Sequence, residues 1–287
     1  MYERPDVVDD TTVLAAVREW WKVDVDAITY LPIGFGGHHW CASWRGEPRL
    51  FVTLEGLGFR HDLTSLGATY AATATLGFAF ANANLEPWVV PLVGHALSVT
   101  PWLDGVRPAI LDVVATTAML DSLHAVTPPP GLRRWAPLVD SDLADRLTDA
   151  VRRPWGAGPF GEQARAAITG RLDEIEGWVA EYHRLADVAR SRPWVTTHGQ
   201  PGIHNQLLTS DGLRLVDWES LMLAPAERDL RTVGVGNDTM VDMFALEWRL
   251  DEVNIGATWL QAPHEGTGDD RETLENLREE LGLPRRA

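Results

Sequence analysis

The sequence predicts an α+β protein in two lobes, with a small antiparallel sheet in the first lobe and a larger helical second lobe. Short apolar pieces alternate around glycines and prolines as far as about residue 100, which is typical of strands joined by turns. Beyond residue 110, apolar residues recur with helical spacing. The 287 residues exceed the usual size of a single domain. We therefore expect an N-terminal lobe over residues 1–100 and a helical lobe over residues 101–287.

The first lobe is expected to contain mostly strands and one inserted helix. "TTVLAAVREWWK" has a helical apolar pattern, while the stretch from Ala27 to Trp44 alternates around glycines as a hairpin does. The predicted elements are a helix over 11–22, a hairpin within 27–44, a strand over 48–56, a helix over 64–80, and strands within 88–92 and 95–103.

The second lobe is expected to be helical, with one further strand. Helical periodicity covers residues 110–126, 138–151 and 162–189. The stretches "TPPPG" and "RRPWGAGPFG" are the longest predicted linkers, because proline and glycine interrupt regular structure. A short apolar strand precedes Asp217. Internal repeats are absent from the sequence.

Charge and cysteine content narrow the class of protein. The net charge of −16 disfavours nucleic acid as a partner, because such binding relies on basic residues that neutralise phosphates. It suits a cationic small molecule, but a solvated acidic surface that aids solubility is the favoured interpretation. Cys41 is the only cysteine, so no intrachain disulfide can form. The first residues lack a signal-peptide pattern and the most apolar stretch has 14 residues, so we expect a cytoplasmic protein without a membrane span.

Lysine content argues against several mechanisms. Lys22 is the only lysine, and it lies between Trp21 and Val23, so the chain has no Gly-Lys-Ser/Thr phosphate-binding loop. Schiff-base chemistry is disfavoured for the same reason. The sequence also contains no Gly-x-Ser-x-Gly and no His-Glu-x-x-His, which removes the usual support for a serine hydrolase or a zinc protease.

Two separated motifs point to phosphate chemistry. "GFGGHH" lies in the turn of the first hairpin, where glycines either cover phosphates or make an ordinary turn. "HGQPGIHN" places Asn205 seven residues after His198, and Asp217 follows twelve residues later. Each residue alone fits a turn or loop role. Their joint spacing favours a pair of oxygen ligands that hold Mg²⁺ against nucleotide phosphates.

With these motifs, the chain resembles the aminoglycoside phosphotransferase and choline kinase superfamily, whose loop has the form His-Gly-Asp-x-x-x-x-Asn. The resemblance covers nearly the whole chain: "ALSVTPWLDG" resembles the hinge, "LDSLHAVTPP" a Leu-His helix end, and "VDWESLMLAPAERDL" the metal segment with its following acid. "GFGGHHW", "FVTLEG" and "HEGTGDD" are similar to an actinobacterial subgroup. The resemblance implies a bilobal protein-kinase-like fold.

The resemblance also implies roles for residues. Asn205 and Asp217 would be the metal ligands, Gln200 would take the position of the catalytic base, and Asp229 would be structural. His198 belongs to the same catalytic loop and is expected to brace it by hydrogen bonds rather than to titrate. The implied nucleotide-binding positions are those of the glycine turn, the third strand and the hinge: Gly34, Gly36, Gly37, Thr53, Thr100 and Trp102.

The chain departs from the family pattern at two places. Gln200 replaces the acid of the loop, and a carboxamide can position a hydroxyl but cannot accept its proton at neutral pH. Thr53 stands where the family has a lysine, and the helix over 64–80 contains no acid to pair with one. Arg49 is a candidate to reach phosphate from another direction.

Three hypotheses follow. The first is a phosphotransferase that uses ATP or GTP with Mg²⁺ to phosphorylate a hydroxyl of a small molecule, of which a cation would suit the charge. The second is a pseudokinase that binds a nucleotide or metabolite without turnover. The third is a kinase fold repurposed for another reaction, for example in natural-product metabolism. The first is favoured because Asn205 and Asp217 are both present.

Overall fold

The structure is a computed structural model, and it describes residues 1–58, 60–236 and 238–285. The chain forms two compact units. The first unit combines Met1–Trp135 with Pro193–Val235, and the second combines Ala136–Arg192 with Gly236–Ala287. The expected lobe boundary at residue 100 falls inside the first unit, at the end of a strand, and stays a prediction.

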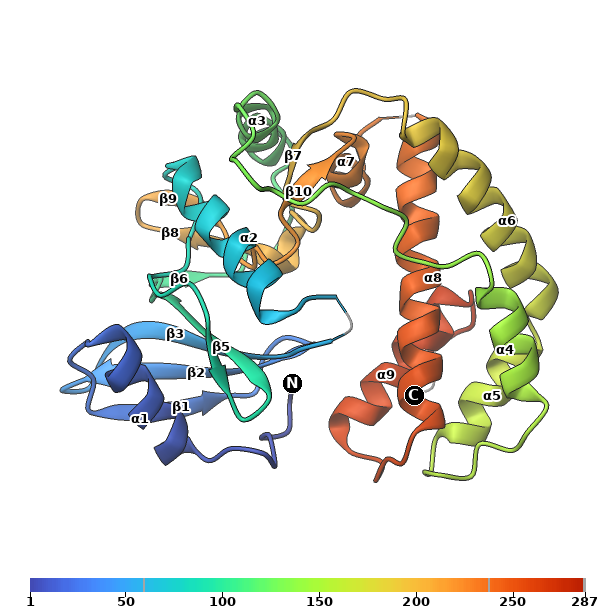
Figure 1. Ribbon diagram of the computed structural model, residues 1–287, viewed down its shortest axis with the longest axis horizontal. Helices are drawn as coiled ribbons and strands as arrows, with labels where there is room; N and C mark the ends of the chain where they lie inside the picture. Colours follow the sequence, from blue (N-terminus) through green and yellow to red (C-terminus); the bar gives the residue numbers. More distant parts are fainter. Residues whose placement is uncertain (59, 237, 286–287) are drawn as a thin grey trace. The chain divides into compact units, whose positions relative to one another are not determined.

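The first unit contains the expected antiparallel sheet, whose five strands have the order β1-β2-β3-β5-β4. One helix precedes the sheet in the sequence and another is inserted after its third strand, as predicted (Figure 1). These elements are α1 (Asp10–Trp21), β1 (Ala27–Leu31), β2 (Gly37–Trp44), β3 (Glu47–Gly56), α2 (Leu63–Leu76), β4 (Val90–Leu92) and β5 (His95–Pro101).

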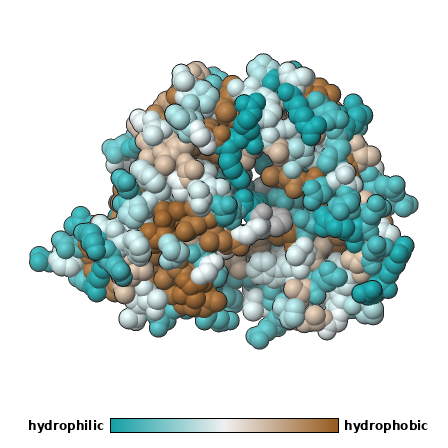
Figure 2. Space-filling view, in the orientation of Figure 1, coloured by the Kyte–Doolittle hydropathy of each residue, from teal (hydrophilic) through white to brown (hydrophobic). Residues whose placement is uncertain are grey.

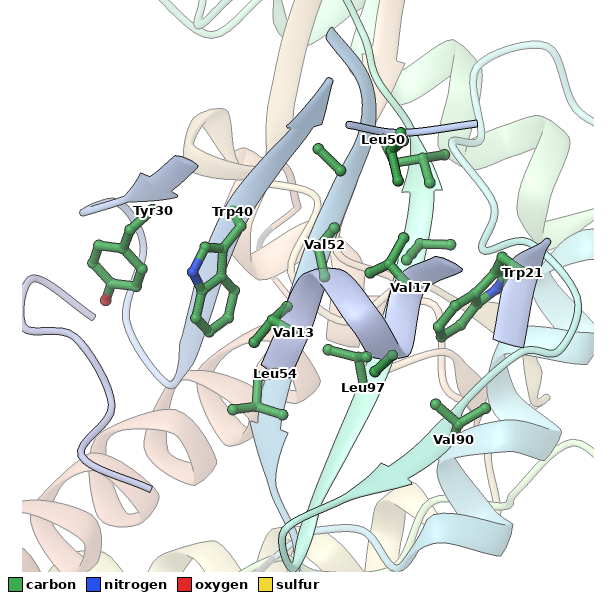
Figure 3. Packing of buried hydrophobic residues seen from close by; sticks show 14 residues of the cluster. Val13, Val17, Trp21, Tyr30, Trp40, Leu50, Val52, Leu54, Val90 and Leu97 are labelled. Carbon is green, nitrogen blue, oxygen red and sulfur yellow. The ribbon is translucent and has the colours of Figure 1, made fainter. Parts of the chain in front are cut away.

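The period-2 pattern of β3 decides which face of the sheet is covered. Leu50, Val52 and Leu54 alternate along the strand and are buried in one cluster with Val13 and Val17 of α1. Figure 3 shows these side chains between the helix and the sheet. The intervening residues of β3 therefore point to the opposite face, which is the face that carries the candidate site.

The rest of the first unit consists of short elements that hold the loop after β7. β7 pairs with β10, and β6, β8 and β9 form a three-stranded sheet. The elements are β6 (Gly105–Val106), α3 (Val113–His124), β7 (Val195–Thr197), the 3₁₀ turn η1 (Ile203–Asn205), β8 (Gln206–Thr209), β9 (Gly212–Leu215), β10 (Met222–Ala224) and α7 (Glu227–Val233).

The second unit is helical, as predicted. The predicted helix over 162–189 is two helices, because the chain turns at Gly170 and Arg171. α8 packs against both α6 and α9, and the buried Tyr182 of α6 donates to Glu247 of α8 at 2.6 Å. The helices are α4 (Leu143–Val151), α5 (Gly161–Thr169), α6 (Leu172–Ala189), α8 (Thr239–Gln261) and α9 (Gly268–Glu280).

The surface is rich in polar side chains. Hydrophilic residues cover much of the face shown in Figure 2, in keeping with 41 acidic and 25 basic residues. In the part of the chain that the structure describes, no helix has the length and apolar character needed to cross a membrane.

Two adjacent tryptophans at the end of α1 test the packing of this helix on the sheet. Trp21 is 8% exposed and donates from Nε1 to the Leu85 carbonyl at 3.2 Å, while Trp20 is 46% exposed. We expect Trp21→Ala to lower the free energy of unfolding by about 3–5 kcal/mol, the range for a large buried side chain. The matched Trp20→Ala change should cost about 0.5 kcal/mol or less. Urea unfolding measures both, and equal losses would contradict the packing described.

Candidate active site

The loop after β7 is held by one buried carboxylate. Asp229 of α7 accepts hydrogen bonds from the backbone N–H groups of His198 at 3.1 Å and Gly199 at 2.5 Å, and it pairs with His124 Nε2 at 2.9 Å. Burial alone would raise the pKa of Asp229, but the bond and charge of His124 bring it below the ordinary value. Gly199 has φ +97° and lies against Arg228, so a side chain there would be strained and would clash.

His198 connects this loop to the segment before Asp217. Its ring is fully buried, with Nε2 at 3.0 Å from the Val216 carbonyl and Nδ1 accepting from the Gln200 N–H at 3.3 Å. Burial lowers the pKa of His198 to about 4, so the ring is neutral at pH 7 and donates from Nε2. This geometry serves to brace the loop.

Asn205 and Asp217 lie together beside the Gln200 backbone. Asn205 donates from Nδ2 to the Gln200 carbonyl at 3.0 Å, and its own carbonyl accepts from Val216 N–H at 3.0 Å. Asp217 has φ +65°, a conformation that costs a non-glycine residue of order 1–3 kcal/mol. Its carboxylate is within hydrogen-bonding reach of the Asn205 side chain. The structure thus brings three of the predicted site residues together.

The Asn205 and Asp217 pair fits a magnesium ion that is shared with phosphates. Both side chains offer hard oxygen atoms, and Mg²⁺ is commonly held by one or two carboxylates together with substrate phosphates. Within residues 1–58, 60–236 and 238–285, no group of three or more His, Cys, Asp or Glu side chains is arranged as a metal site of its own. Solvent reaches Asp217, yet the surrounding protein and then the Glu219 carboxylate raise its pKa to about 7.

The glycine turn lies over a histidine. Gly34 and Gly36 have φ of +72° and +96°, which only glycine adopts without strain, and Gly37 begins β2. The imidazole of His39 packs against this turn. A Cβ atom added to Gly34 would lie 3.1 Å from Nε2 of His39. The Met1 amino group donates to the Gly34 and Gly37 carbonyls at 2.9 and 2.8 Å.

The strand and helix that would carry the Lys–Glu pair are joined by a different pair. Thr53 lies on the face of β3 opposite to α1, here called the open face, and its hydroxyl is 3.2 Å from Nδ1 of His39. Two residues further along the same face, Glu55 accepts a hydrogen bond from Tyr70 of α2 at 2.5 Å. The acid is on the strand and its partner is on the helix, the reverse of the family arrangement. The sequence analysis missed this pair.

Glu55 is part of a group of acids that also contains Asp217 and Glu219. Burial first, and the neighbouring Glu219 carboxylate second, raise the pKa of Glu55 well above its ordinary value, and Asp217 adds to the effect. Glu219 lies within hydrogen-bonding reach of Glu55. The raised pKa favours the protonated form of Glu55, which can donate to Glu219 while it accepts from Tyr70.

The expected hinge positions lie at the end of β5. Thr100 pairs with Phe51 across β3 and β5, and the Trp102 N–H donates to the Arg49 carbonyl at 2.9 Å. This N–H is thus already used within the protein. Pro101 has no N–H to offer. Arg49 itself is exposed at the start of β3.

A pH titration of stability tests the environment of Glu55. Because the folded-state pKa is raised above the unfolded value of 4.5, the unfolded chain ionises first as pH rises and the wild type loses stability. Glu55→Gln keeps the acceptor for Tyr70 and has no such loss. We expect its advantage in unfolding free energy to grow as the pH rises above about 4.5, by at most about 1.4 kcal/mol per pH unit. The control is Glu47→Gln, an exposed residue at the start of the same strand. Parallel curves for wild type and Glu55→Gln would contradict the assignment.

One curated protein is similar to this chain in sequence. No protein-family model matches the chain. It is 30% identical over 193 residues to the protein StrN of Streptomyces griseus, and the match spans 59% of each protein, about three fifths of this curated relative's length. The relative comes from an actinobacterium, as the resemblance implied.

Solved structures agree over nearly the full chain. A spectinomycin phosphotransferase in complex with ADP and spectinomycin superposes with a TM-score of 0.74 at 12% identity, covering 95% of this chain and 94% of that one. An ethanolamine kinase of Plasmodium vivax has a TM-score of 0.63 at 11% identity, covering 99% of this chain and 91% of that one. At these identities the matches show the fold alone: the chain has the fold of these two kinases, as the sequence predicted.

Proposed function

We propose that the protein is a small-molecule phosphotransferase, which transfers the terminal phosphate of ATP or GTP to a hydroxyl group. The observation that carries this proposal is the pairing of Asn205 with an Asp217 held at φ +65°. A strained residue persists only where its surroundings impose it, and such residues cluster at functional sites. Here the surroundings are His198 and Asn205, which bind the carbonyl and the N–H of Val216.

The residues present support a nucleotide and Mg²⁺ as the cofactors. Asn205 and Asp217 would hold the ion, which would neutralise charge on the phosphates when bound. The glycine turn offers backbone N–H groups beside the same open face of the sheet. Phe51 and Trp102, with ring centroids 6.4 Å apart, give that face an aromatic surface on which a base can stack.

Gln200 sets the expected speed of the reaction. The side chain stands in the loop whose backbone Asn205 and His198 hold, so it can orient an acceptor hydroxyl. It cannot take the proton, and general-base assistance is worth about 10²–10⁴-fold. Phosphoryl transfer depends mainly on positioning and charge neutralisation, so a slow reaction is compatible with this loop.

The acceptor is proposed to be a small hydroxylated molecule, and a cation suits the charge of −16. The structural neighbours support this class, since one is a spectinomycin phosphotransferase and another is an ethanolamine kinase. We propose no nucleic acid partner, because such binding relies on many basic residues that neutralise a run of backbone phosphates, and acids outnumber bases here by 41 to 25.

Binding without turnover is the second candidate function. It is favoured by Thr53, which leaves the open face without the lysine of the family, and by Gln200 in place of the base. The carboxyl groups of Glu55, Asp217 and Glu219 also lie close together, which disfavours a bare polyphosphate there. A pseudokinase would bind a nucleotide or metabolite at this face and release it unchanged.

Replacing Asp217 tests the metal site. Asp217→Asn removes the principal anionic ligand, so we expect the Mg²⁺-dependent affinity for ATP or GTP to fall about tenfold or more in calorimetric titration. The matched control is Asp211→Asn, which changes an exposed acid in the β8–β9 turn. An Asp217→Asn protein that is folded and keeps its Mg²⁺-dependent affinity would remove this residue from the metal site.

Restoring the family residues separates turnover from binding. If the site is a phosphotransferase that lacks its base, Gln200→Asp should raise ADP release about tenfold or more with a panel of hydroxylated acceptors. Thr53→Lys should add to the gain. ADP release that stays undetectable in the double variant, although nucleotide binds, would favour the pseudokinase. No nucleotide binding by the unmodified protein would overturn the phosphotransferase proposal.

A further inference from the structure

The position of the missing lysine has a cross-strand neighbour that is able to bind phosphate. β2 and β3 pair with His39 opposite Thr53. Trp40, Val52 and Leu54 point into the core under α1, so His39 and Thr53 share the open face of the sheet. Their side chains are in contact, with His39 Nδ1 at 3.2 Å from Thr53 Oγ1.

The imidazole is held in one orientation. It stacks on Phe51 with ring centroids 4.9 Å apart and an interplanar angle of 29°. When the Thr53 hydroxyl donates to Nδ1, the ring proton lies on Nε2. Among the residues that the structure describes, Nε2 has no hydrogen-bond partner.

The free ring nitrogen lies at the glycine turn. A Cβ on Gly34 would be 3.1 Å from Nε2, and a Cβ on Gly37 would be 3.3 Å from Cε1. The Nε2 edge of the ring therefore reaches between the two glycines, where backbone N–H groups of a turn with positive φ favour an anion. Burial first, then the Met1 amino group and His38, lower the pKa of His39 to about 3, so at neutral pH the ring is an uncharged donor.

We propose that His39 replaces the strand lysine as the side chain that binds the nucleotide phosphates, and that Thr53 positions its ring. This inference rests on the proposed function. Thr53 would then be the residue that fixes which ring nitrogen carries the proton. A neutral His39 supplies a directed hydrogen bond, whereas a lysine supplies a positive charge. Mg²⁺ must therefore neutralise more of the phosphate charge here than in a site with the lysine, and the affinity for phosphate depends more strongly on Mg²⁺.

Calorimetric titration of ligands into variants of two adjacent histidines, His38 and His39, tests the assignment. The probes are ATP with Mg²⁺, inorganic triphosphate with Mg²⁺, and adenosine. His39→Ala should lower the affinity for the two phosphate compounds about tenfold or more and leave that for adenosine unchanged. His39→Gln, which keeps a donor, should retain part of the affinity. The matched control is His38→Ala, because His38 points to the other face of β2 and contacts Tyr30 at 3.2 Å.

The outcomes separate this inference from the proposed function. If the unmodified protein binds ATP and both His39 variants bind it equally well or more tightly, His39 is no phosphate ligand, while the phosphotransferase proposal stands. A loss confined to ATP and triphosphate supports the assignment. If the unmodified protein binds none of ATP, GTP and triphosphate, the proposed function fails and the assignment fails with it.

Discussion

The buried carboxylate of Asp229 is the interaction on which the candidate site depends. It satisfies two backbone N–H groups that no water can reach, and each would cost about 1–3 kcal/mol if left unpaired. By fixing His198, it also fixes the ring that holds the Val216 carbonyl. Val216 directly precedes Asp217, whose backbone has φ +65°. A series of hydrogen bonds therefore runs from Asp229 of α7 to the residue before Asp217.

The open face of the sheet follows a second constraint, which is the alternation along β3. Once Leu50, Val52 and Leu54 are committed to the core, Thr53 and Glu55 must share the other face. A carboxylate there could not stay charged in a buried position beside Glu219, so it is paired with a hydroxyl and shifts toward its neutral form. The electrostatic character of this face differs from that of the family pattern for this reason.

The sequence was sufficient for much of the fold, because periodicity is a local property. The strands and helices of residues 1–101 are close to where their patterns predict them, and the break between α5 and α6 at Gly170 could have been read from that glycine. The strands β6, β7, β8 and β10 were not predicted, because two to four residues are too few to show a period. The spacing of Asn205 and Asp217 predicted their proximity. The partners of Glu55 and His39 could not be predicted in this way. Tyr70 meets Glu55 only through helix placement, and His39 meets Thr53 only through strand register.

The pair of Glu55 and Tyr70 changes how α2 can respond to its surroundings. Where an ion pair joins the inserted helix to the sheet, dissolved ions and phosphates compete for the two charged groups and can break the pair. Here α2 is joined to β3 by a buried hydrogen bond from Tyr70 to an acid whose pKa is raised. Dissolved salt screens charges and has little effect on such a bond. Salt therefore acts on the attachment of α2 indirectly, through the charges of Glu219 and Asp217 that raise the pKa of Glu55.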